Sequence, residues 1–479
     1  MKRTLLVVLS VAIALGAGVS AQHPPAWAPQ ADAVFADVAR PDAPGCALAV
    51  YRDGRIAYER GYGIADLEHD VPITPASVFY VGSLSKQFTA FAVALAASEG
   101  KLSIDDDVRK WIPELPDYGA RLTLRHLLHH TSGLRDYNTL FDIAGRRNDE
   151  AFDNQIVLGI VARQRALNFP PGEQYLYSNS GYVLLSLVVE RATGEPLAAY
   201  AKKRIMEPLG MRDTQFYDDV TRVVKNRAFA YDRTAAGGLH DNTPHSQRTG
   251  AGGVLTTVRD LLAWDNNFYE PKVGTKAVIA AMQQPGSLNS GKPLTYAYGL
   301  QIGEYRGEPI VEHGGSLGGY RAHLIRFPRA HASVACLCNF GTSDPGSRAR
   351  RVADVVLHDR FTSPAPSRTA GVPAEDRARS TDVKLKADQI SQYVGLYRSE
   401  ELDTTFVFDA NGSTLRLKRE RDPAPMPLRA LGVDRFGFRG MVIRFLRENS
   451  PGSKVTGLAI DAGRVENIRF SAAASSATR

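Results

Sequence analysis

The order of strand-like and helical patterns along the 479-residue chain is the feature that most limits its fold. Strand-like runs occur early, at 46–51 and 55–62, with an Asp-Gly hairpin signal between them. Strand patterns return only at 298–340, followed by a helical pattern near 347–359, whereas the long middle section is mostly helical. Because both chain ends supply strands, the order predicts one sheet built from the two ends, with a helical lobe over one side. We expect an α/β (α+β) arrangement with a ligand cleft between the two lobes.

A change of composition follows this α/β unit, which we assign to residues 22–361. Residues 362–388 are rich in Pro, Ala, Ser and charged residues, a composition typical of a linker. Beyond the linker the apolar pattern has period two, which predicts a small all-β, barrel-like domain at 389–472. The last residues, 473–479, have the composition of a frayed tail. A chain of this length has room for such a two-domain organisation.

The N-terminus has the three parts of a secretory signal peptide. Lys2 and Arg3 are charged, residues 5–15 are apolar, and the Val-Ser-Ala sequence at 19–21 resembles a cleavage site. We therefore expect residues 1–21 to be removed and the mature protein to be exported, either periplasmic or secreted. The apolar run is too short to span a membrane, so no transmembrane segment is expected after cleavage.

The net charge of +7 initially suggests an anionic partner. Two of the positive charges lie in the predicted signal peptide, and the other basic residues are interspersed with acidic ones. No basic run of the kind that binds nucleic acid is present, so we expect no nucleic-acid partner. The charge specifies neither a partner nor an oligomeric state.

The three cysteines are too few for a disulfide framework. Cys336 and Cys338 alternate in a strand-like run, so both side chains face the same side of the predicted sheet. We expect all three cysteines to be small buried hydrophobic side chains. A disulfide from Cys46 to one of the pair is an alternative that the sequence does not support.

The first reactive pattern is Ser83 and Lys86, in the run SLSK at the start of a predicted helix. Residues three apart lie on one helical face, so the lysine amine can reach the serine hydroxyl. A serine becomes a nucleophile when a base takes its proton, and a buried lysine with a depressed pKa can be that base. The pattern alone is weak, because residue frequencies predict about one such match in a chain of this length. A second match, Ser98 to Lys101, spans a glycine where the helix should end.

Two further runs carry polar groups that a serine nucleophile would need. Tyr177 and Asn179 lie in a loop before an apolar helix. The sequence His313-Gly-Gly315-Ser316 follows a predicted strand, where a backbone without side-chain bulk can approach a substrate. Each run taken alone is more often structural, since a tyrosine before a helix is commonly an anchor and His-Gly-Gly commonly a turn.

Together and in this order, the three runs resemble the penicillin-binding-protein-like serine hydrolases. This superfamily includes class C β-lactamases, serine esterases and D-amino-acid-specific aminopeptidases, and its pattern is S-x-x-K, then Y-x-N, then K-T-G or H-x-G. Surrounding strings also resemble the family: VFYVGSLSKQFTA, LTLRHLLHHTSGL, FPPGEQYLYSNSGYVLL, TGAGGVLTTVRDLLAWD and VEHGGSLGGY. The resemblance covers residues 35–360 and implies the β-lactamase-like two-lobe fold.

The resemblance implies an acyl-enzyme mechanism without a cofactor. Ser83 would attack a carbonyl carbon, and Lys86 and Tyr177 would share the role of general base. Asn179 would orient Lys86 and the substrate amide, while the backbone N–H groups of Ser83 and Ser316 would hold the oxyanion. His313 and Gly315 match H-x-G and would form the substrate-binding edge of the sheet.

His313 stands where K-T-G members have a lysine. A lysine is cationic at pH 7 and suits a β-lactam carboxylate, whereas a histidine is mostly neutral. We therefore expect weak or no β-lactamase activity, and a small ester, short peptide or peptidoglycan-derived amide as the substrate, in the manner of an esterase or D-amino-acid peptidase. The alternatives are a sensor that binds a peptide or β-lactam without turnover, and a true class C β-lactamase.

Two further patterns are candidates for a role in the site. The sequence leaves the role of the first open and assigns no role to the second. Residues 392–397 (QYVGLY) resemble the start of the β-barrel domain that follows the catalytic domain in D-aminopeptidase-like family members. Such a domain could narrow the cleft, or it could be a packing module without substrate contact. His126, His129 and His130 have metal-ligand spacing, but no further ligand completes a set, so we expect no metal.

Overall fold

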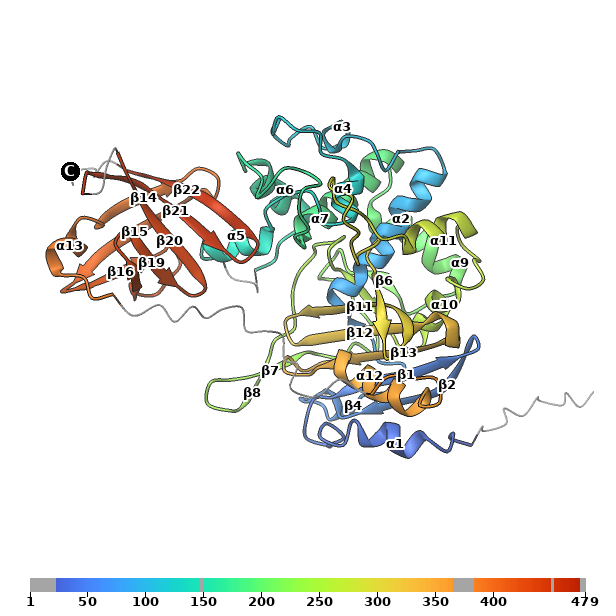
Figure 1. The fold of residues 1–479 in the computed structure, drawn as a ribbon. Helices are drawn as coiled ribbons and strands as arrows, with labels where there is room; N and C mark the ends of the chain where they lie inside the picture. The colour runs from blue at the N-terminus through green and yellow to red at the C-terminus, as the bar shows by residue number, and fades with distance from the viewer. Residues whose placement is uncertain (1–22, 147–149, 365–382, 449–451, 474–479) are drawn as a thin grey trace, which may run out of the picture.

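The computed structural model describes residues 23–146, 150–364, 383–448 and 452–473. The predicted signal peptide, most of the linker and most of the tail lie outside these described residues. Within them, the chain forms a six-stranded antiparallel sheet, a helical lobe and a separate β domain (Figure 1).

The six-stranded sheet is built from both ends of the α/β part of the chain, which confirms the prediction. Its strands, in spatial order, are β10 (Gln301–Tyr305), β11 (Glu308–Leu317), β12 (Tyr320–Phe327), β13 (Ala332–Cys338), β1 (Cys46–Arg52) and β2 (Arg55–Tyr62). Late strand β13 pairs with early strand β1. The turn between β1 and β2 is formed by Asp53 and Gly54, both with positive φ as a two-residue hairpin of this type requires.

The two faces of the sheet are covered by different helices. Along β1, successive side chains point to opposite faces. Val50 packs in a core with α1 (Ala28–Ala33) and α12 (Pro345–Val356), whereas Tyr51 packs in the core of the helical lobe. The sequence predicted helices over one side, but the sheet is covered on both. The sheet is therefore a buried middle layer, and strand β11, next to the edge strand β10, contacts the helical lobe.

The helical lobe comes from the middle of the chain, and α2 packs against α7. Its helical segments are η1 (Gly82–Ser85), α2 (Lys86–Ser98), α3 (Val108–Trp111), α4 (Leu124–Leu128), α5 (Tyr137–Ile143), α6 (Asn154–Ala162), α7 (Asn179–Thr193), α8 (Leu197–Ala201), η2 (Lys202–Met206), α9 (Glu207–Leu209), α10 (Asp260–Asn266) and α11 (Lys276–Gln283). Short strands complete this part of the chain: β3 (Ile64–Asp66), β4 (Val71–Pro72), β5 (Phe79–Tyr80), β6 (Gln215–Phe216), β7 (Tyr231–Arg233), β8 (Leu239–Asp241) and β9 (Val254–Thr256). None of the helices in the described ranges has the length and apolarity needed to cross a membrane.

The C-terminal β domain is one antiparallel nine-stranded, barrel-like sheet preceded by α13 (Ala387–Ser391). Its strands, in spatial order, are β17 (Met426–Pro427), β16 (Thr414–Lys418), β15 (Thr404–Asn411), β14 (Gly395–Ser399), β22 (Val465–Ala472), β21 (Val455–Ala462), β20 (Met441–Arg447), β19 (Arg435–Phe438) and β18 (Arg429–Gly432). Alternating aromatic side chains such as Phe406 and Phe408 fill its interior.

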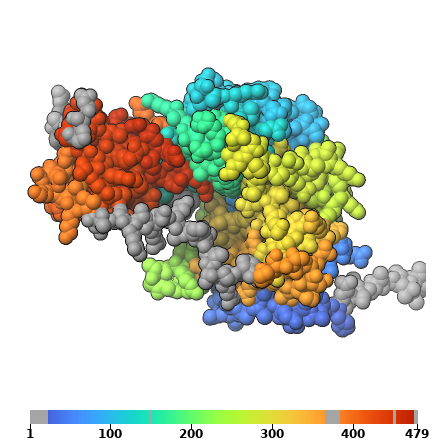
Figure 2. Space-filling model, in the orientation of Figure 1, coloured from blue at the N-terminus to red at the C-terminus, as the bar shows by residue number. Residues whose placement is uncertain are grey.

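The β domain packs against the helical lobe (Figure 2). Arg135, next to α5, is almost fully buried and donates a 2.6 Å hydrogen bond to Glu401 Oε2. The same guanidinium donates to the carbonyl oxygens of Glu466 and Asn467 on β22. This buried ion pair fixes the β domain beside the residues that precede α5, and Asp136 is among them.

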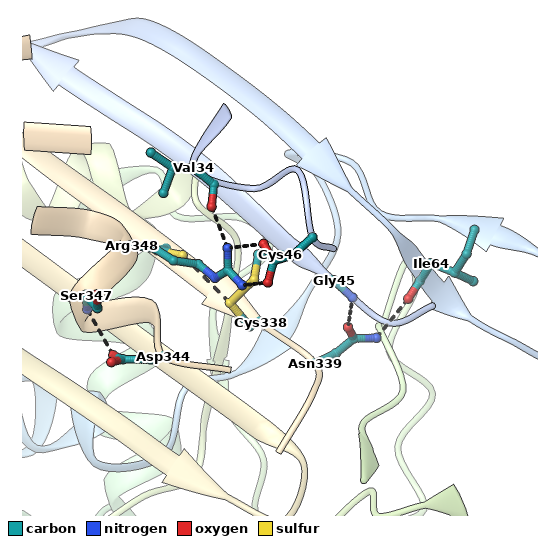
Figure 3. The surroundings of a disulfide bond; sticks show 11 residues. Val34, Gly45, Cys46, Ile64, Cys338, Asn339, Asp344, Ser347 and Arg348 are labelled. Atoms are coloured by element: carbon teal, nitrogen blue, oxygen red, sulfur yellow. Dashed lines mark hydrogen bonds and ion pairs between the residues drawn. A yellow bond between two sulfur atoms is a disulfide. The ribbon is translucent and has the colours of Figure 1, made fainter. Parts of the chain in front are cut away.

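The expectation that all three cysteines are unpaired is wrong for two of them. Cys46 and Cys338 lie directly opposite each other on β1 and β13 and form a disulfide across a sequence separation of 292 residues (Figure 3). Sequence periodicity predicted that Cys336 and Cys338 lie on one side of their strand, but it did not show which strands are neighbours. Cys336 remains a buried thiol, and burial raises its pKa to about 12.

Polar side chains hold the chain around this disulfide in place. Asn339 accepts a hydrogen bond from the N–H of Gly45 and donates one to the carbonyl of Ile64 (Figure 3). Arg348 of α12 lies beside the disulfide and donates to the carbonyl of Val34. These contacts tie the N-terminal segment to the late strands and to α12.

Candidate active site

Ser83 lies in the 3₁₀ turn η1, one residue after Gly82 and three before Lys86. The sequence predicted Ser83 at the start of the helix, whereas α2 itself begins at Lys86. The tighter turn keeps the two side chains on one side, and Lys86 Nζ lies 3.1 Å from Ser83 Oγ. The structure therefore places the proposed nucleophile and an amine within hydrogen-bond distance.

The backbone of η1 is in close contact with the backbone of β11. A Cβ atom added to Gly315 would lie 1.9 Å from the carbonyl oxygen of Val81, and one added to Gly82 would lie 2.5 Å from the nitrogen of Ser316. Only glycine fits at these two positions, and the φ of Gly82 is also positive at 51°. The contact brings the backbone segments of Ser83 and Ser316 together, as an oxyanion site made from both would require.

Lys86 is fully buried and makes hydrogen bonds to neutral groups only. Besides Ser83, its Nζ contacts Asn179 Oδ1 and the carbonyl oxygen of Ala251, each at 2.8 Å. Burial holds the pKa of Lys86 well below its usual value, although the nearby Asp136 carboxylate raises it. A lysine in this environment is favoured in its neutral form, which can accept a proton.

Tyr177 lies beside this amine, with the centre of its ring 4.8 Å from Lys86 Nζ. Burial raises the pKa of the Tyr177 phenol, and its contact with Ser83 opposes this effect. Both shifts favour the neutral forms of these groups, the protonated Tyr177 phenol and the unprotonated Lys86 amine. The sequence alone did not determine this distribution of the proton.

Asn179 is the first residue of α7 and links Lys86 to a carboxylate that the sequence analysis missed. Its Nδ2 donates to Asp136 Oδ2 at 2.9 Å, and its backbone N–H donates to the same oxygen at 2.7 Å. Asp136 is 1% exposed and also caps α5. An aspartate before a helix is a capping signal, but its contact with Asn179 joins residues far apart in the chain.

His313 lies on β11, and both of its ring nitrogens are engaged. Nδ1 lies 2.6 Å from the carbonyl oxygen of Gly314, which only accepts, so Nδ1 carries the proton. Nε2 then accepts a hydrogen bond from the hydroxyl of Tyr296 at 3.0 Å. Burial lowers the pKa of His313 to about 3, so the ring is neutral.

The three histidines with metal-ligand spacing do not converge on one point. Nδ1 of His126 accepts from the N–H of Thr123 in a capping box, and Nδ1 of His129 lies 3.1 Å from the carbonyl oxygen of Tyr296. Nδ1 of His130 accepts from the N–H of Ser178, which positions the loop that carries Tyr177. In the described part of the chain, the side-chain clusters with metal-ligand spacing do not include Ser83 or the residues around it.

A pocket of about 760 Å³ opens onto Ser83. Its walls come from the sheet, the helical lobe and the β domain, and its polar lining includes Tyr177, Asn179, His313, Asn138, Arg248 and Arg464. Arg464 lies in the turn between β21 and β22, and its guanidinium lies 5.1 Å from the centre of the Tyr177 ring. The sequence analysis missed both arginines, because neither belongs to a motif and the two domains meet only in the folded chain.

Known proteins resemble this chain over most of its length. The D-aminopeptidase of Gluconobacter oxydans is 29% identical over 307 residues, which are 64% of this chain and 58% of that enzyme. Penicillin-binding protein 4* of Bacillus subtilis is 30% identical over 362 residues, or 72% of this chain and 77% of that protein. The chain thus spans little more than half the length of the D-aminopeptidase.

Solved structures share the fold. The octameric penicillin-binding protein homologue from Pyrococcus abyssi superposes with a TM-score of 0.63 at 24% identity, over 92% of this chain and 99% of that one. The D-amino acid amidase of Ochrobactrum anthropi SV3 superposes with a TM-score of 0.60 at 24% identity, over 70% of this chain and 99% of that one. A sequence model of the Beta-lactamase family matches residues 31–357, a range that includes Ser83, Lys86, Tyr177, Asn179 and His313. With two-thirds of its length matched, this chain belongs to the beta-lactamase family.

Proposed function

We propose that this protein is a serine hydrolase that cleaves a small ester or amide through an acyl-enzyme on Ser83. The observation that carries the proposal is the buried amine of Lys86, 3.1 Å from Ser83 Oγ and paired with no carboxylate among the described residues. A nucleophile needs a base that is neutral at working pH, and burial shifts the pKa of Lys86 in that direction.

The geometry supports a two-step reaction. Neutral Lys86 takes the proton of Ser83 as Oγ bonds to the substrate carbonyl carbon, and the backbone N–H groups of Ser83 and Ser316 stabilise the oxyanion. The bond to the leaving group then breaks, and Tyr177 relays the proton from Lys86 to the leaving nitrogen or oxygen. Water then attacks the Ser83 ester and gives one proton to Lys86 and Tyr177. The acid is released, and Ser83 regains its proton from these two groups.

The substrate class we propose is an amide, ester or short peptide of a D-amino acid, including peptidoglycan-derived fragments. It rests on the relatives named D-aminopeptidase and on the structural neighbour named D-amino acid amidase. Its test is a panel of p-nitrophenyl esters and of D- and L-alanyl anilides with the full chain. We expect turnover with D-selectivity on the amides; L-selectivity would remove the D-amino-acid part of the proposal.

The nucleophile is tested by Ser83→Ala, with Ser98→Ala as the matched control. Ser98 belongs to the second S-x-x-K match, but its hydroxyl donates to the carbonyl of Leu95 at the end of α2. We expect Ser83→Ala to lose at least about a thousandfold in kcat/KM, because nucleophile and base act as one unit. Retained activity in Ser83→Ala would refute the assignment.

We also propose that β-lactamase activity is weak or absent, because neutral His313 stands at the sheet edge in place of a cation. A chromogenic cephalosporin assay tests this, and rapid turnover would favour the class C β-lactamase alternative. Stable labelling of Ser83 by a penicillin, without turnover of any ester or amide, would favour the sensor alternative.

Export to the periplasm or the medium is our proposal for the location. The apolar N-terminal run motivates it, and the Cys46–Cys338 disulfide suits an oxidising compartment. Cell fractionation followed by intact mass measurement is the test. We expect a mature chain that begins at Gln22 and is lighter by the two hydrogen atoms lost when Cys46 and Cys338 are oxidised to the disulfide; an intact Met1 in the cytosolic fraction would contradict export.

A further inference from the structure

The charge of the catalytic pocket is not explained by the residues that act on the scissile bond. Three arginines line the pocket, Arg248, Arg321 and Arg464, whereas Asp344 is the acidic residue in its lining among the described residues. The Asp344 carboxylate accepts the N–H of Ser347 and caps α12. The pocket is therefore cationic apart from one carboxylate that is already engaged.

Arg248 is the most unusual of these arginines. It is 4% exposed, and its guanidinium donates to Ser246 Oγ at 2.7 Å and to Asn138 Oδ1 at 3.3 Å. It packs over the Tyr137 ring, with 5.2 Å between the guanidinium carbon and the ring centre. No carboxylate among the described residues forms an ion pair with it. A buried, unpaired cation is costly, and an anionic ligand in the pocket would compensate for it.

Arg464 reaches the same side of the pocket from the β domain. Its Nη1 lies 3.3 Å from Asp136 Oδ2, and its side chain is 41% exposed. Asp136 and Asn138, the contacts of the two arginines, flank Tyr137 in the chain, so both guanidinium groups belong to one wall. The same Asp136 oxygen also accepts two hydrogen bonds from Asn179, so Arg464 shares it with two other donors.

We propose that Arg248 and Arg464 form a carboxylate-binding subsite, and that the substrates hydrolysed at Ser83 carry a free carboxylate. Guanidinium groups bind carboxylates by charge-assisted, bidentate hydrogen bonds. A substrate with a free ammonium group, as an aminopeptidase requires, would meet like charge there. The inference rests on the proposed hydrolase function and specifies its substrate. It also gives the β domain a role, because one half of the subsite belongs to that domain.

The test compares two matched pairs of substrates with the full chain. N-acetyl-D-alanyl-D-alanine and its C-terminal amide place the charge on the leaving group, whereas N-succinyl- and N-acetyl-D-phenylalanine p-nitroanilide place it on the acyl side. In one of the two pairs, we expect kcat/KM to be about tenfold or more higher for the substrate with the free carboxylate than for its neutral partner, as a charge-assisted hydrogen bond implies. D-phenylalanine p-nitroanilide, with its free amine, should be the poorest anilide.

Arg248→Gln and Arg464→Gln should each reduce this preference by about tenfold. Arg469→Gln is the control, because Arg469 is an exposed arginine of β22 outside the catalytic pocket, and it should leave the preference unchanged. A merely structural role would lower kcat/KM for both members of a pair equally and leave their ratio intact. Arg464 is partly exposed, so its variant remains informative if the Arg248 variant fails to fold.

Two outcomes separate the failure of the subsite from the failure of the hydrolase. Equal kcat/KM for the charged and neutral members of both pairs would overturn the subsite proposal but not the hydrolase proposal. The same holds if the ratio of the two kcat/KM values is unchanged in both arginine variants. A wild-type chain that cleaves none of the esters, amides or peptides would overturn the proposed function and the subsite together.

Discussion

At the scale of single residues, the reactivity of the site depends on which of two buried side chains, Lys86 or Tyr177, carries a proton. Lys86 and Tyr177 are both buried, and desolvation penalises the charged form of each. The pKa of Lys86 is therefore lowered and that of Tyr177 is raised. The same effect keeps His313 neutral, with a pKa of about 3. The residue types were recognisable from the sequence, but their protonation states depend on the atoms around them.

Replacing Lys86 with arginine separates positive charge from basicity. A guanidinium stays protonated at every accessible pH, so Lys86→Arg cannot accept the Ser83 proton. We expect kcat/KM to fall by about 10²- to 10⁴-fold, the usual contribution of general base catalysis. Lys101→Arg, in the second S-x-x-K match, is the control and should keep wild-type activity. An arginine variant within tenfold of wild type would exclude Lys86 as the base.

The pH dependence of the wild type follows from the same shift. Protonated Lys86 is inactive, so kcat/KM rises with pH through the pKa of Lys86. Because burial lowers that pKa, the rise should occur well below the range of an ordinary lysine. His313 should add no limb between pH 5 and 8, since its pKa is about 3. A pH–rate profile that rises only above pH 10 would contradict the lowered pKa.

At the scale of elements, the contact between η1 and β11 decides whether the site can form. The sequence showed glycines at the end of a strand, and the structure shows why they are needed. A Cβ on Gly315 would overlap the Val81 carbonyl, so β11 could not approach the turn that carries Ser83. The distance between these backbones depends on sheet register and on the fit of the helical lobe, neither of which a local pattern contains.

Gly315→Ala tests this contact against Gly303→Ala on the neighbouring strand β10. At Gly303 the nearest atom to an added Cβ is 3.7 Å away on Ile310, an ordinary contact. We expect Gly315→Ala to lose about 1–3 kcal/mol of stability through overpacking. It should also lose about 10²- to 10³-fold in kcat, the effect of one lost oxyanion donor. Thermal unfolding and steady-state kinetics measure both effects. Equal behaviour of the two variants would show that the backbone contact is unimportant.

At the scale of the whole molecule, the β domain and the helical lobe are joined by a buried ion pair. Arg135 and Glu401 are separated by 266 residues, and both side chains are less than 10% exposed. Their pairing helps to place the β21–β22 turn, and with it Arg464, at the catalytic pocket. The sequence left open whether the β domain contacts the substrate site; in the folded chain the domain contributes a residue to its wall.

Replacing one member of this ion pair should lower the free energy of unfolding more than replacing both members. Arg135→Met leaves the Glu401 carboxylate buried and unpaired, which we expect to lower the free energy of unfolding by about 3–5 kcal/mol. Arg135→Met with Glu401→Leu should recover most of that loss, because no charge stays buried. Urea unfolding of the wild type, the two single variants and the double variant measures the coupling. Additive losses would show that the pair does not hold the domains together.

The sequence by itself determined the elements and predicted the catalytic residue types. Period-two and helical spacing placed the β1–β2 hairpin, the strands near 298–340 and the barrel-like domain, because these patterns depend on neighbours a few residues apart. Only the tertiary structure decided which distant residues meet. The Cys46–Cys338 disulfide, the Asp136–Asn179 contact and the entry of Arg464 into the pocket each join segments separated by more than 40 residues. Such contacts depend on strand order and domain docking, and burial after docking sets the charge of each group in the site.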